Sequence, residues 1–532
     1  MFKILEKPII VILLLLLLSG YLYFSQMGKF ALTDPDETFY AQTAKEMVEK
    51  GEWLTPYLYG KPQFEKPILF YWLVEASYKV FGINEFAARF PSGLFGFIGL
   101  AAIYLLGRLL FNNRVGIFSA IVLATNVEYV ILANACVTDM LLSTCMLLGV
   151  LFFFYGQIRK KGYFYVLSAA ALGLSVLTKG PIGLLLPGFI IFVYMMFVRD
   201  FTLFKKFKVI AWSSLVFMLI ALPWYIVMYK SHANTFMDEF FGFHNITRFL
   251  TPEHKTGSEI YYNIPVIFGG FFPWSAFLPL GAWKMLTGIR KPESANRSHS
   301  IFMLLWLIVI FIFFTVSSTK LPTYIFPCFI SLAVIVGKFW DDFLTRQSER
   351  PVIVGMRASY YFLILAVVLG LIGGYIFIKI DSPDILPAAV NAGLFMAFGM
   401  GLSFAAFIRK RFLAAFILIA CSVGLILYPI SKKVLPFVEG YESSKPASRA
   451  LMAYYKPGDV IGCERDYRPG VAFYTGIIPV FLSNSSNLSE FINKGETVWG
   501  VLKKRNITDD SMRVIYQYGK KRVITNSKEE LK

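Results

Sequence analysis

Residues 139–161 read DMLLSTCMLLGVLFFFYGQIRKK, in which one acidic residue precedes an apolar stretch and a basic cluster follows it. The apolar stretch is close to the roughly 20 residues that a helix needs to cross the hydrocarbon core of a bilayer. Basic residues gather at the cytoplasmic ends of such helices. The segment therefore predicts a membrane-spanning helix with Asp139 at its outer end and Arg159-Lys160-Lys161 at its inner end.

The same pattern recurs along the chain. We predict about thirteen spans from runs of this length, near residues 8–26, 88–108, 115–133, 139–157, 163–178, 181–198, 209–228, 262–283, 301–317, 322–339, 359–380, 387–408 and 412–430. If the N-terminus is cytoplasmic, the inner gaps hold the basic residues Arg108, Arg114, Arg159 to Lys161, Lys205, Lys206, Lys208, Arg290, Lys291, Arg346, Arg350 and Arg409 to Arg411. This alternation of charge supports the orientation.

The composition excludes a soluble protein. Of the 532 residues, 56% are apolar and only 16% are charged, whereas soluble chains carry about 25% charged residues. The excess apolar surface must face lipid, where continuous apolar runs can only be helices. The net charge of +18 comes largely from the inner gaps. Because no basic stripe or nucleic-acid-binding module accompanies this charge, we expect no nucleic-acid partner.

Three segments are too polar to be spans, and the predicted orientation places all of them outside. They are the loops 27–87 and 229–261 and the tail 436–532. The tail contains β-like runs at 460–462 and 498–502, which predict a small extracytoplasmic α/β domain. The predicted fold is therefore an all-α polytopic membrane domain, residues 1–435, followed by this α/β domain.

The outer face carries carboxylates at helix ends. Asp34, Asp36 and Glu37 open the first loop, where Asp34-Pro35 could cap a helix whose apolar face lies on the membrane. Asp139 is harder to explain, because a charge in hydrocarbon costs several kcal/mol. The alternative interpretation is that the acids at both positions, and Thr138, only cap helices.

Cations occur at helix ends on the same face, at Lys66, Lys179 and Lys320. They could extend passively to the water interface, but the positive-inside bias disfavours basic residues there. His244 and Arg248 lie in the second outer loop and suggest a phosphate or, more weakly, a metal site. Carboxylates and cations together suit a lipid-anchored phosphate substrate.

A series of short motifs resembles the integral-membrane GT-C glycosyltransferases, especially the lipid A aminoarabinose transferases and the protein O-mannosyltransferases. The motifs are Asp36-Glu37, Tyr40-Ala41, Gly51-Glu52-Trp53, Phe64-Glu65-Lys66-Pro67, Tyr71-Trp72, Thr138-Asp139, Leu177 to Gly180, and Lys320 to Tyr324. They occur in the order and spacing of the family. The chain departs from the lipid A enzymes at Phe39, where they often have arginine, and at Phe243, where a glutamate precedes their loop histidine.

The resemblance implies a polyprenyl-phosphate-linked sugar donor, no nucleotide cofactor and a lipid-bilayer location in the cytoplasmic (inner) membrane. It implies that Asp36 is the main catalytic carboxylate and that Asp139 supports it. The implied substrate- and phosphate-binding residues are Glu37, Tyr40, Lys66, Lys179, Arg248, Lys320 and Tyr324. A divalent metal, if present, would be held by Glu65 and His244.

The acceptor stays open between lipid A, lipopolysaccharide core, another envelope glycan and protein. A transporter or flippase of lipid-linked sugars is the alternative function. Such transporters usually have paired repeats and midplane charges, but in this sequence the charges gather at one face. A purely structural or sensory role would leave the pair of carboxylates unexplained.

Overall fold

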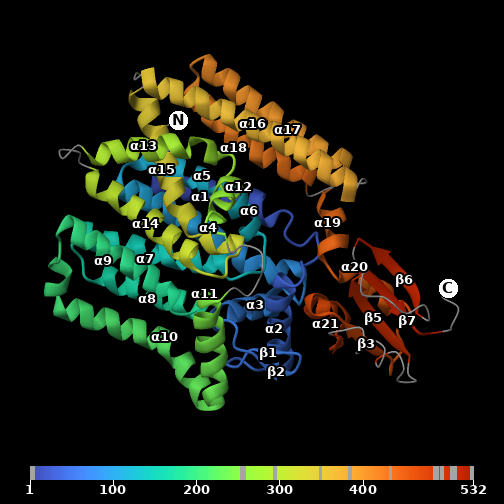
Figure 1. Cartoon of the computed structure of the whole chain (residues 1–532). Helices are drawn as coiled ribbons and strands as arrows, with labels where there is room; N and C mark the ends of the chain where they lie inside the picture. Colours follow the sequence, from blue (N-terminus) through green and yellow to red (C-terminus); the bar gives the residue numbers. More distant parts are fainter. Residues whose placement is uncertain are drawn as a thin grey trace.

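The computed structural model describes residues 6–251, 259–290, 296–346, 350–381, 386–430, 434–482, 491, 497–503, 512–519 and 521–527. Most of the chain forms a helical bundle, and the strands of the C-terminal region lie at one end of it (Figure 1). Helices α2 and α3, which belong to the first predicted outer loop, lie between the bundle and this C-terminal region (Figure 1).

The helices run from α1 to α21. The first half of the chain forms α1 (Pro8–Ser19), η2 (Gly20–Phe24), α2 (Asp36–Lys50), α3 (Leu69–Phe81), α4 (Glu85–Leu110), α5 (Asn113–Ala124), α6 (Val127–Ala133), α7 (Asp139–Arg159), α8 (Tyr163–Lys179), α9 (Ile182–Val198), η3 (Thr202–Lys205), α10 (Phe207–Phe236), η4 (Met237–Thr247) and α11 (Arg248–Leu250). The second half forms α12 (Asn263–Gly270), η5 (Trp274–Phe277), α13 (Leu278–Ile289), α14 (Arg297–Val316), η6 (Pro322–Ile325), α15 (Cys328–Arg346), α16 (Arg350–Asp381), α17 (Leu386–Ile408), α18 (Phe412–Pro429), α19 (Leu435–Glu442), α20 (Lys445–Met452), η9 (Arg465–Tyr467) and α21 (Arg468–Thr475).

The predicted apolar runs are helical. Among the described residues, six helices are long and apolar enough to span a membrane, or eight if each of two bent pairs counts as one span. The bent pairs are α5 with α6, at 69°, and α12 with the segment Trp274–Ile289, at 110°. Other predicted spans correspond to shorter apolar helices such as α8 and α9. The polytopic architecture is therefore supported, and the number thirteen stays a prediction.

Local sequence explains how these helices begin and pack. Asn84 precedes α4 and its side chain accepts a hydrogen bond from the backbone N–H of Ala87, which satisfies a donor in the first turn. Helices α4 and α5 approach closely where Gly107 faces Gly116, because a Cβ atom at either glycine would overlap the other helix. Small residues commonly allow such contacts between membrane helices.

Helix α2 is enclosed by protein. Nine of its 15 residues are buried, and the helix packs against α3 and α21. The short hairpin of β1 (Tyr57–Leu58) and β2 (Lys61–Pro62) follows it. The prediction of a helix in this loop is confirmed. Its expected position on the membrane surface is wrong, because both its polar and its apolar side chains pack inside the protein.

The C-terminal strands form a five-stranded sheet in the order β4-β3-β5-β7-β6. Its strands are β3 (Val460–Cys463), β4 (Val480–Phe481), β5 (Val498–Lys503), β6 (Arg513–Tyr518) and β7 (Lys521–Thr525). Strand β3 pairs in parallel with β4 and β5, whereas β7 pairs antiparallel with β5 and β6. Both β-like runs named from the sequence are strands. The division of the chain into domains at residue 435 stays a prediction.

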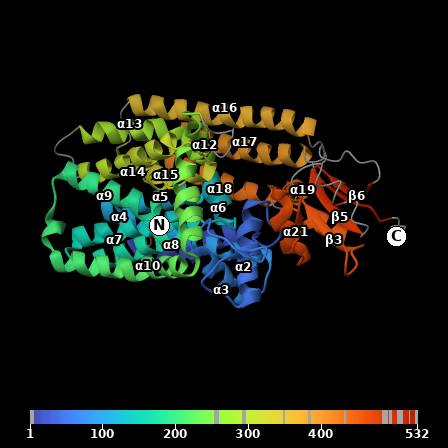
Figure 2. The same ribbon diagram turned by 60° about the horizontal axis from the view of Figure 1, so that its bottom comes forward.

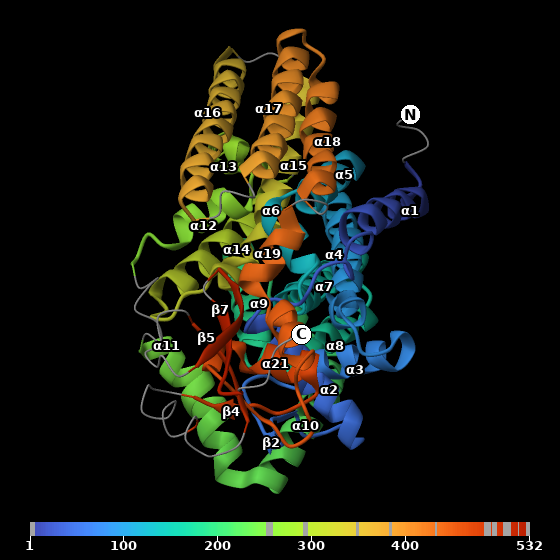
Figure 3. The same cartoon turned by 90° about the vertical axis from the view of Figure 1, so that its right-hand side faces the viewer.

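Figure 2 shows the sheet at one end of the molecule, beyond the ends of α16 and α17, and Figure 3 shows it in front of the bundle. Helices α16 and α17 run along one side of the bundle, and α19 leads from α18 towards the sheet (Figures 1 and 3). The site described below lies on the same side as α2 and α3, where the acidic ends of the helices meet.

Candidate active site

A cavity of about 370 Å³ opens where the ends of several helices meet. Its polar wall combines three cations, one carboxylate and a phenol, namely Lys66, Lys179, Arg248, Glu65 and Tyr324. The rest of its wall is largely apolar and includes Leu142, Ile182, Leu185, Phe241, Phe313 and Phe314. Three positive charges against the Glu65 carboxylate, with the Asp139 carboxylate paired to Lys179 behind the wall, leave an excess of one positive charge. Such a surface suits an anionic group attached to an apolar chain.

Ion pairs hold the cations in place. The Glu65 carboxylate lies 3.0 Å from an Arg248 guanidinium nitrogen and 3.3 Å from the Lys66 ammonium. The Lys179 ammonium lies 2.6 Å from an Asp139 carboxylate oxygen and 4.7 Å from the centre of the Tyr324 ring. Burial lowers the pKa of the Lys66 ammonium. Segments separated by more than 180 residues thus converge here, because Arg248 contacts Glu65.

Asp36 is the first residue of α2 and its side chain is exposed to solvent. Partial burial by surrounding protein atoms, followed by the negative charges of Glu65 and Asp139, raises its pKa above the ordinary value of 3.8. The two predicted catalytic carboxylates therefore lie close enough to repel one another electrostatically. They are on the same side of the bundle, as the sequence predicted.

Asp139 is the first residue of α7, and Thr138 precedes it without making a side-chain capping bond. The alternative interpretation, in which Thr138 simply caps this helix, is therefore wrong. The Asp139 carboxylate accepts a hydrogen bond from Lys179 instead. Likewise, Pro35 precedes α2, and no side chain caps its first turn.

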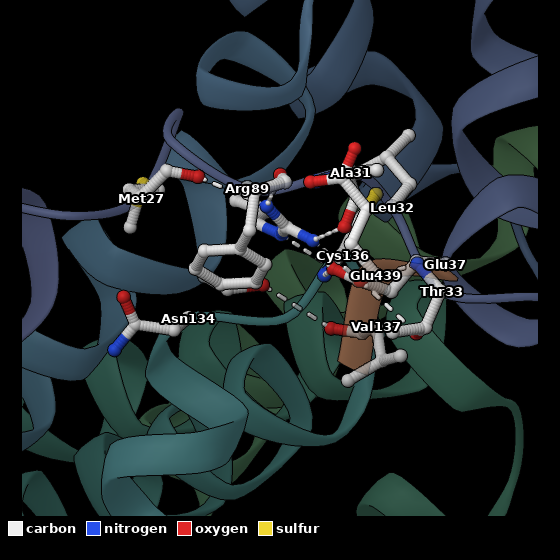
Figure 4. Close-up of polar contacts among 12 residues, drawn as sticks. Met27, Ala31, Leu32, Thr33, Glu37, Arg89, Asn134, Cys136, Val137 and Glu439 are labelled. Carbon is white, nitrogen blue, oxygen red and sulfur yellow. Dashed lines mark hydrogen bonds and ion pairs between the residues drawn. The ribbon is translucent and has the colours of Figure 1, made fainter. Parts of the chain in front are cut away.

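Glu37 is turned away from the cavity towards Arg89 in α4. The Arg89 guanidinium makes two hydrogen bonds of 2.7 Å to the Glu37 carboxylate. The carboxylate also accepts bonds from the backbone N–H of Cys136 at 2.8 Å and from the N–H and hydroxyl of Thr33 at 2.9 and 3.0 Å (Figure 4). Burial raises the pKa of Glu37, but the Arg89 charge and the hydrogen bonds from Arg89, Thr33 and Cys136 together outweigh burial and hold the pKa below 4.5. This environment makes Glu37 a structural anchor and gives no support to its predicted contact with substrate.

Tyr40 and Lys320 are buried beside the cavity rather than in its wall. Tyr40 packs edge-on against the Phe70 ring, with 5.5 Å between ring centres. Lys320 is 6% exposed, and the cavity wall contains its neighbour Thr319 instead. Their predicted contacts with substrate stay predictions.

The two predicted metal ligands are Glu65 and His244. Within the part of the chain that the structure describes, no group of three or more His, Cys, Asp or Glu side chains could hold a metal ion. Glu65 is already paired with two cations. The side chain of His244 lies outside the described residues. The predicted metal site therefore stays a prediction.

Sequence reasoning missed two buried charged residues. It did not single out Arg89, although an arginine inside the predicted span 88–108 was a visible signal. It treated Asp34 as a helix cap, whereas the Asp34 carboxylate lies 3.8 Å from the Lys521 ammonium, almost 500 residues later in the chain. No local pattern could have predicted that contact.

Comparisons with known proteins concern the sequence and the fold as a whole. A family model described as dolichyl-phosphate-mannose-protein mannosyltransferase matches residues 65–226, a range that includes Lys66, Asp139 and Lys179. Undecaprenyl phosphate-alpha-4-amino-4-deoxy-L-arabinose arabinosyl transferase 2 of Proteus mirabilis is 28% identical over 364 residues. That alignment covers 67% of this chain and 64% of the relative, which is less than two thirds of the relative's own length.

Two solved structures share the fold. The crystal structure of ArnT from Cupriavidus metallidurans bound to undecaprenyl phosphate superposes with a TM-score of 0.81 at 21% identity, covering 97% of this chain and 98% of that one. The archaeal oligosaccharyltransferase AglB from Archaeoglobus fulgidus has a TM-score of 0.53 at 13% identity, covering 93% of this chain and 69% of that one. The resemblance to GT-C glycosyltransferases that the motifs predicted is confirmed.

Proposed function

We propose that this protein is a glycosyltransferase that moves a sugar from a polyprenyl-phosphate donor to an acceptor of the cell envelope. The proposed site of transfer is the outer face of the cytoplasmic membrane, where the basic gaps of the sequence place the loops that carry Asp36 and Lys66. The donor is linked to a lipid, so no nucleotide cofactor is expected.

The main support for this proposal is the excess of positive charge in the wall of the cavity. A sugar joined to polyprenyl phosphate is a phosphodiester with one negative charge, and the departing polyprenyl phosphate gains a second. Lys66, Lys179 and Arg248 line the cavity, so they stabilise the developing negative charge more strongly than the charge of the bound donor. Interactions that strengthen towards the transition state are the ones that raise the rate. The apolar wall offers a path for the prenyl chain.

Transfer needs a nucleophile on the face of the sugar opposite the departing phosphate. In the proposed step the acceptor oxygen forms a bond to the anomeric carbon, while the bond from that carbon to the phosphate oxygen breaks and its electron pair leaves with the phosphate. If the acceptor is a hydroxyl, Asp36 takes its proton as general base. If the acceptor is an anionic phosphate, Asp36 orients it. Asp139 keeps the Lys179 ammonium in place.

The names of the relatives support a lipid-linked donor, but they do not identify the acceptor for this chain. Lipid A, lipopolysaccharide core, another glycan and protein all remain candidates. Comparing envelope glycolipids by mass spectrometry in cells with and without this protein would distinguish lipid acceptors from the others.

The decisive experiment follows radiolabelled sugar from polyprenyl phosphate in vesicles that contain the purified protein and envelope extract. We expect label to move to a new acceptor, and Asp36→Asn to lower this transfer by orders of magnitude at an unchanged protein level. Glu49→Gln is the matched control, because this carboxylate lies on the same helix with a side chain that is 54% exposed. Label that only crosses the bilayer would support a flippase instead, and full activity of Asp36→Asn would refute the catalytic role.

A further inference from the structure

The stretch of chain just before α2 is held by the C-terminal region. Three of its backbone N–H groups donate hydrogen bonds there, Ala31 to the Glu439 carboxylate at 3.2 Å, Leu32 to the Tyr474 hydroxyl at 2.8 Å and Asp34 to the Glu442 carbonyl at 2.7 Å. These partners belong to α19 and α21 or to the residues between them. The loop that carries Asp36 is therefore attached to a part of the chain more than 400 residues away.

A buried charge pair lies at the centre of this attachment. The Asp34 side chain is 3% exposed and the Lys521 side chain, in β7, is 2% exposed, with 3.8 Å between carboxylate and ammonium. The Ser444 hydroxyl also donates to the Asp34 carboxylate. Burial raises the pKa of Asp34 to about 7 and lowers that of Lys521, although each charge favours the ionised form of the other. An ionised carboxylate in this position depends on its counterion.

The packing around Asp34 leaves little room for adjustment. A Cβ atom at Gly470 in α21 would overlap the Asp34 carboxylate and approach the Ser444 side chain. The Lys521 ammonium also lies 5.1 Å from the centre of the Tyr467 ring. Figure 3 shows α21 and the strands grouped beside α2, in agreement with the contacts between α2 and α21.

The pair is connected to Asp36 through the first turn of α2. Asp36 follows Asp34 by two residues, and the Thr38 hydroxyl donates to the Asp34 carboxylate at 2.9 Å. On the other side of Asp36, the Glu37 carboxylate is fixed by Arg89. The first turn of α2 thus has two buried anchors, one in the membrane bundle and one in the C-terminal sheet.

We propose that Lys521 is a positioning residue of the site: by neutralising Asp34, the C-terminal sheet fixes the first turn of α2, and with it the position of Asp36. This inference rests on the proposed function for its kinetic consequence. Lys521 does not line the cavity, so its effect on Asp36 passes through Asp34 and the first turn of α2. The C-terminal sheet is then part of the catalytic apparatus, in addition to stabilising the fold.

A positioning role has a different kinetic signature from a purely structural one. Neither Asp34 nor Lys521 lines the cavity that holds the predicted phosphate-binding cations Lys66, Lys179 and Arg248, so donor binding should not depend on this pair. Loss of Lys521 should displace Asp36 and lower kcat while leaving the donor KM unchanged. A merely structural role would reduce the amount of folded protein and leave the kinetics of the remaining protein as they were.

The experiment uses the full chain in lipid nanodiscs with polyprenyl-phosphate sugar as donor. We expect Lys521→Met to lower kcat by about 10- to 100-fold, because a displacement of about 1 Å can have that effect. The double variant Asp34→Asn/Lys521→Met removes both charges, and we expect it to regain most of the lost kcat. Arg522→Met is the matched control, since this partly buried neighbour in β7 donates to Gln517 and points to the other face of the sheet.

A second measurement does not require activity. The thiol introduced by Asp36→Cys, in a background with the exposed Cys421 changed to serine, reports the exposure of this position through its rate of alkylation by a maleimide. We expect Lys521→Met to change that rate and Arg522→Met to leave it unchanged.

The outcomes are separable. Wild-type kcat and an unchanged alkylation rate in Lys521→Met would overturn the positioning role. A loss of folded protein with normal kcat in the remainder would also overturn it. If the wild type transfers no sugar but alkylation still responds to Lys521→Met, the proposed function fails and the positioning role stands.

Discussion

Replacing Arg89 by methionine tests the ion pair that joins the first turn of α2 to the membrane bundle. The Arg89 side chain is fully buried and the Glu37 side chain is 5% exposed. All five N–H donors of the guanidinium are used: two on the Glu37 carboxylate and three on the carbonyl oxygens of Met27, Phe30 and Ala31. Methionine fills much of the same volume but leaves the Glu37 charge without its counterion.

The structure sets the expected magnitude. Removing one partner of a buried ion pair costs about 3–5 kcal/mol, because the other charge stays buried without compensation. Three bonds from Thr33 and Cys136 would still reach the Glu37 carboxylate, so we expect the lower half of that range, about 3–4 kcal/mol. This is a large part of the roughly 5–15 kcal/mol that stabilises a typical protein domain.

The assay is reversible denaturation of the purified protein in mixed micelles, followed by tryptophan fluorescence. The double variant Arg89→Met/Glu37→Gln should be more stable than Arg89→Met alone, because it removes the uncompensated charge. The control Glu49→Gln disrupts an exposed pair at 3.9 Å from Lys45 and should change the free energy of unfolding by less than about 0.5 kcal/mol. A change below about 1 kcal/mol in Arg89→Met, or a double variant as unstable as the sum of the single ones, would refute this account.

Four further predictions concern the cavity and the contact between the first loop and the C-terminal region. Arg248→Met removes a cavity cation, and we expect it to weaken the binding of polyprenyl phosphate about tenfold or more in a calorimetric titration; unchanged affinity would contradict the phosphate-binding role. Because Asp36 must be ionised to accept a proton, and burial and then the Glu65 charge raise its pKa, Glu65→Gln should move the acidic limb of the kcat/KM profile to lower pH. A limb that stays in place would show that Asp36 is not the titrating group. The pKa of Asp34 rises from 3.8 to about 7 on folding, so its contribution to stability declines as pH increases through that interval. Asp34→Asn should therefore flatten the dependence of the unfolding free energy on pH between about 4 and 7, and an unaltered slope would exclude this linkage. A methyl group at Gly470 would overlap the Asp34 carboxylate, so Gly470→Ala should lower the midpoint of thermal unfolding. A wild-type midpoint would mean that the packing between α21 and the first loop can adjust to the methyl group.

Much of the site followed from charge placement along the chain. The sequence shows Lys66, Lys179 and Asp139 at the ends of apolar runs, and the alternation of basic gaps puts these ends on one face. Charged side chains at the same end of neighbouring helices are therefore expected to lie close to one another. The structure accordingly brings Lys66 and Lys179 into one cavity and joins Asp139 to Lys179.

The individual partners could not be predicted in this way. Glu37 stands next to Asp36, and the sequence gives no reason why one carboxylate should face solvent and the other a buried arginine. The choice depends on the direction in which the first turn of α2 enters the protein, and that direction is set by Arg89 on a different helix.

The sequence by itself determined that this chain is a polytopic helical membrane protein, because length, apolarity and charge at helix ends are local properties that decide whether a helix is stable in a bilayer. Only the tertiary structure decided which charges pair. Asp34 is buried against Lys521, and that contact exists because the C-terminal sheet folds back onto the first loop. Packing between distant segments selects such partners, and the local sequence of either segment does not indicate which residue will be the partner.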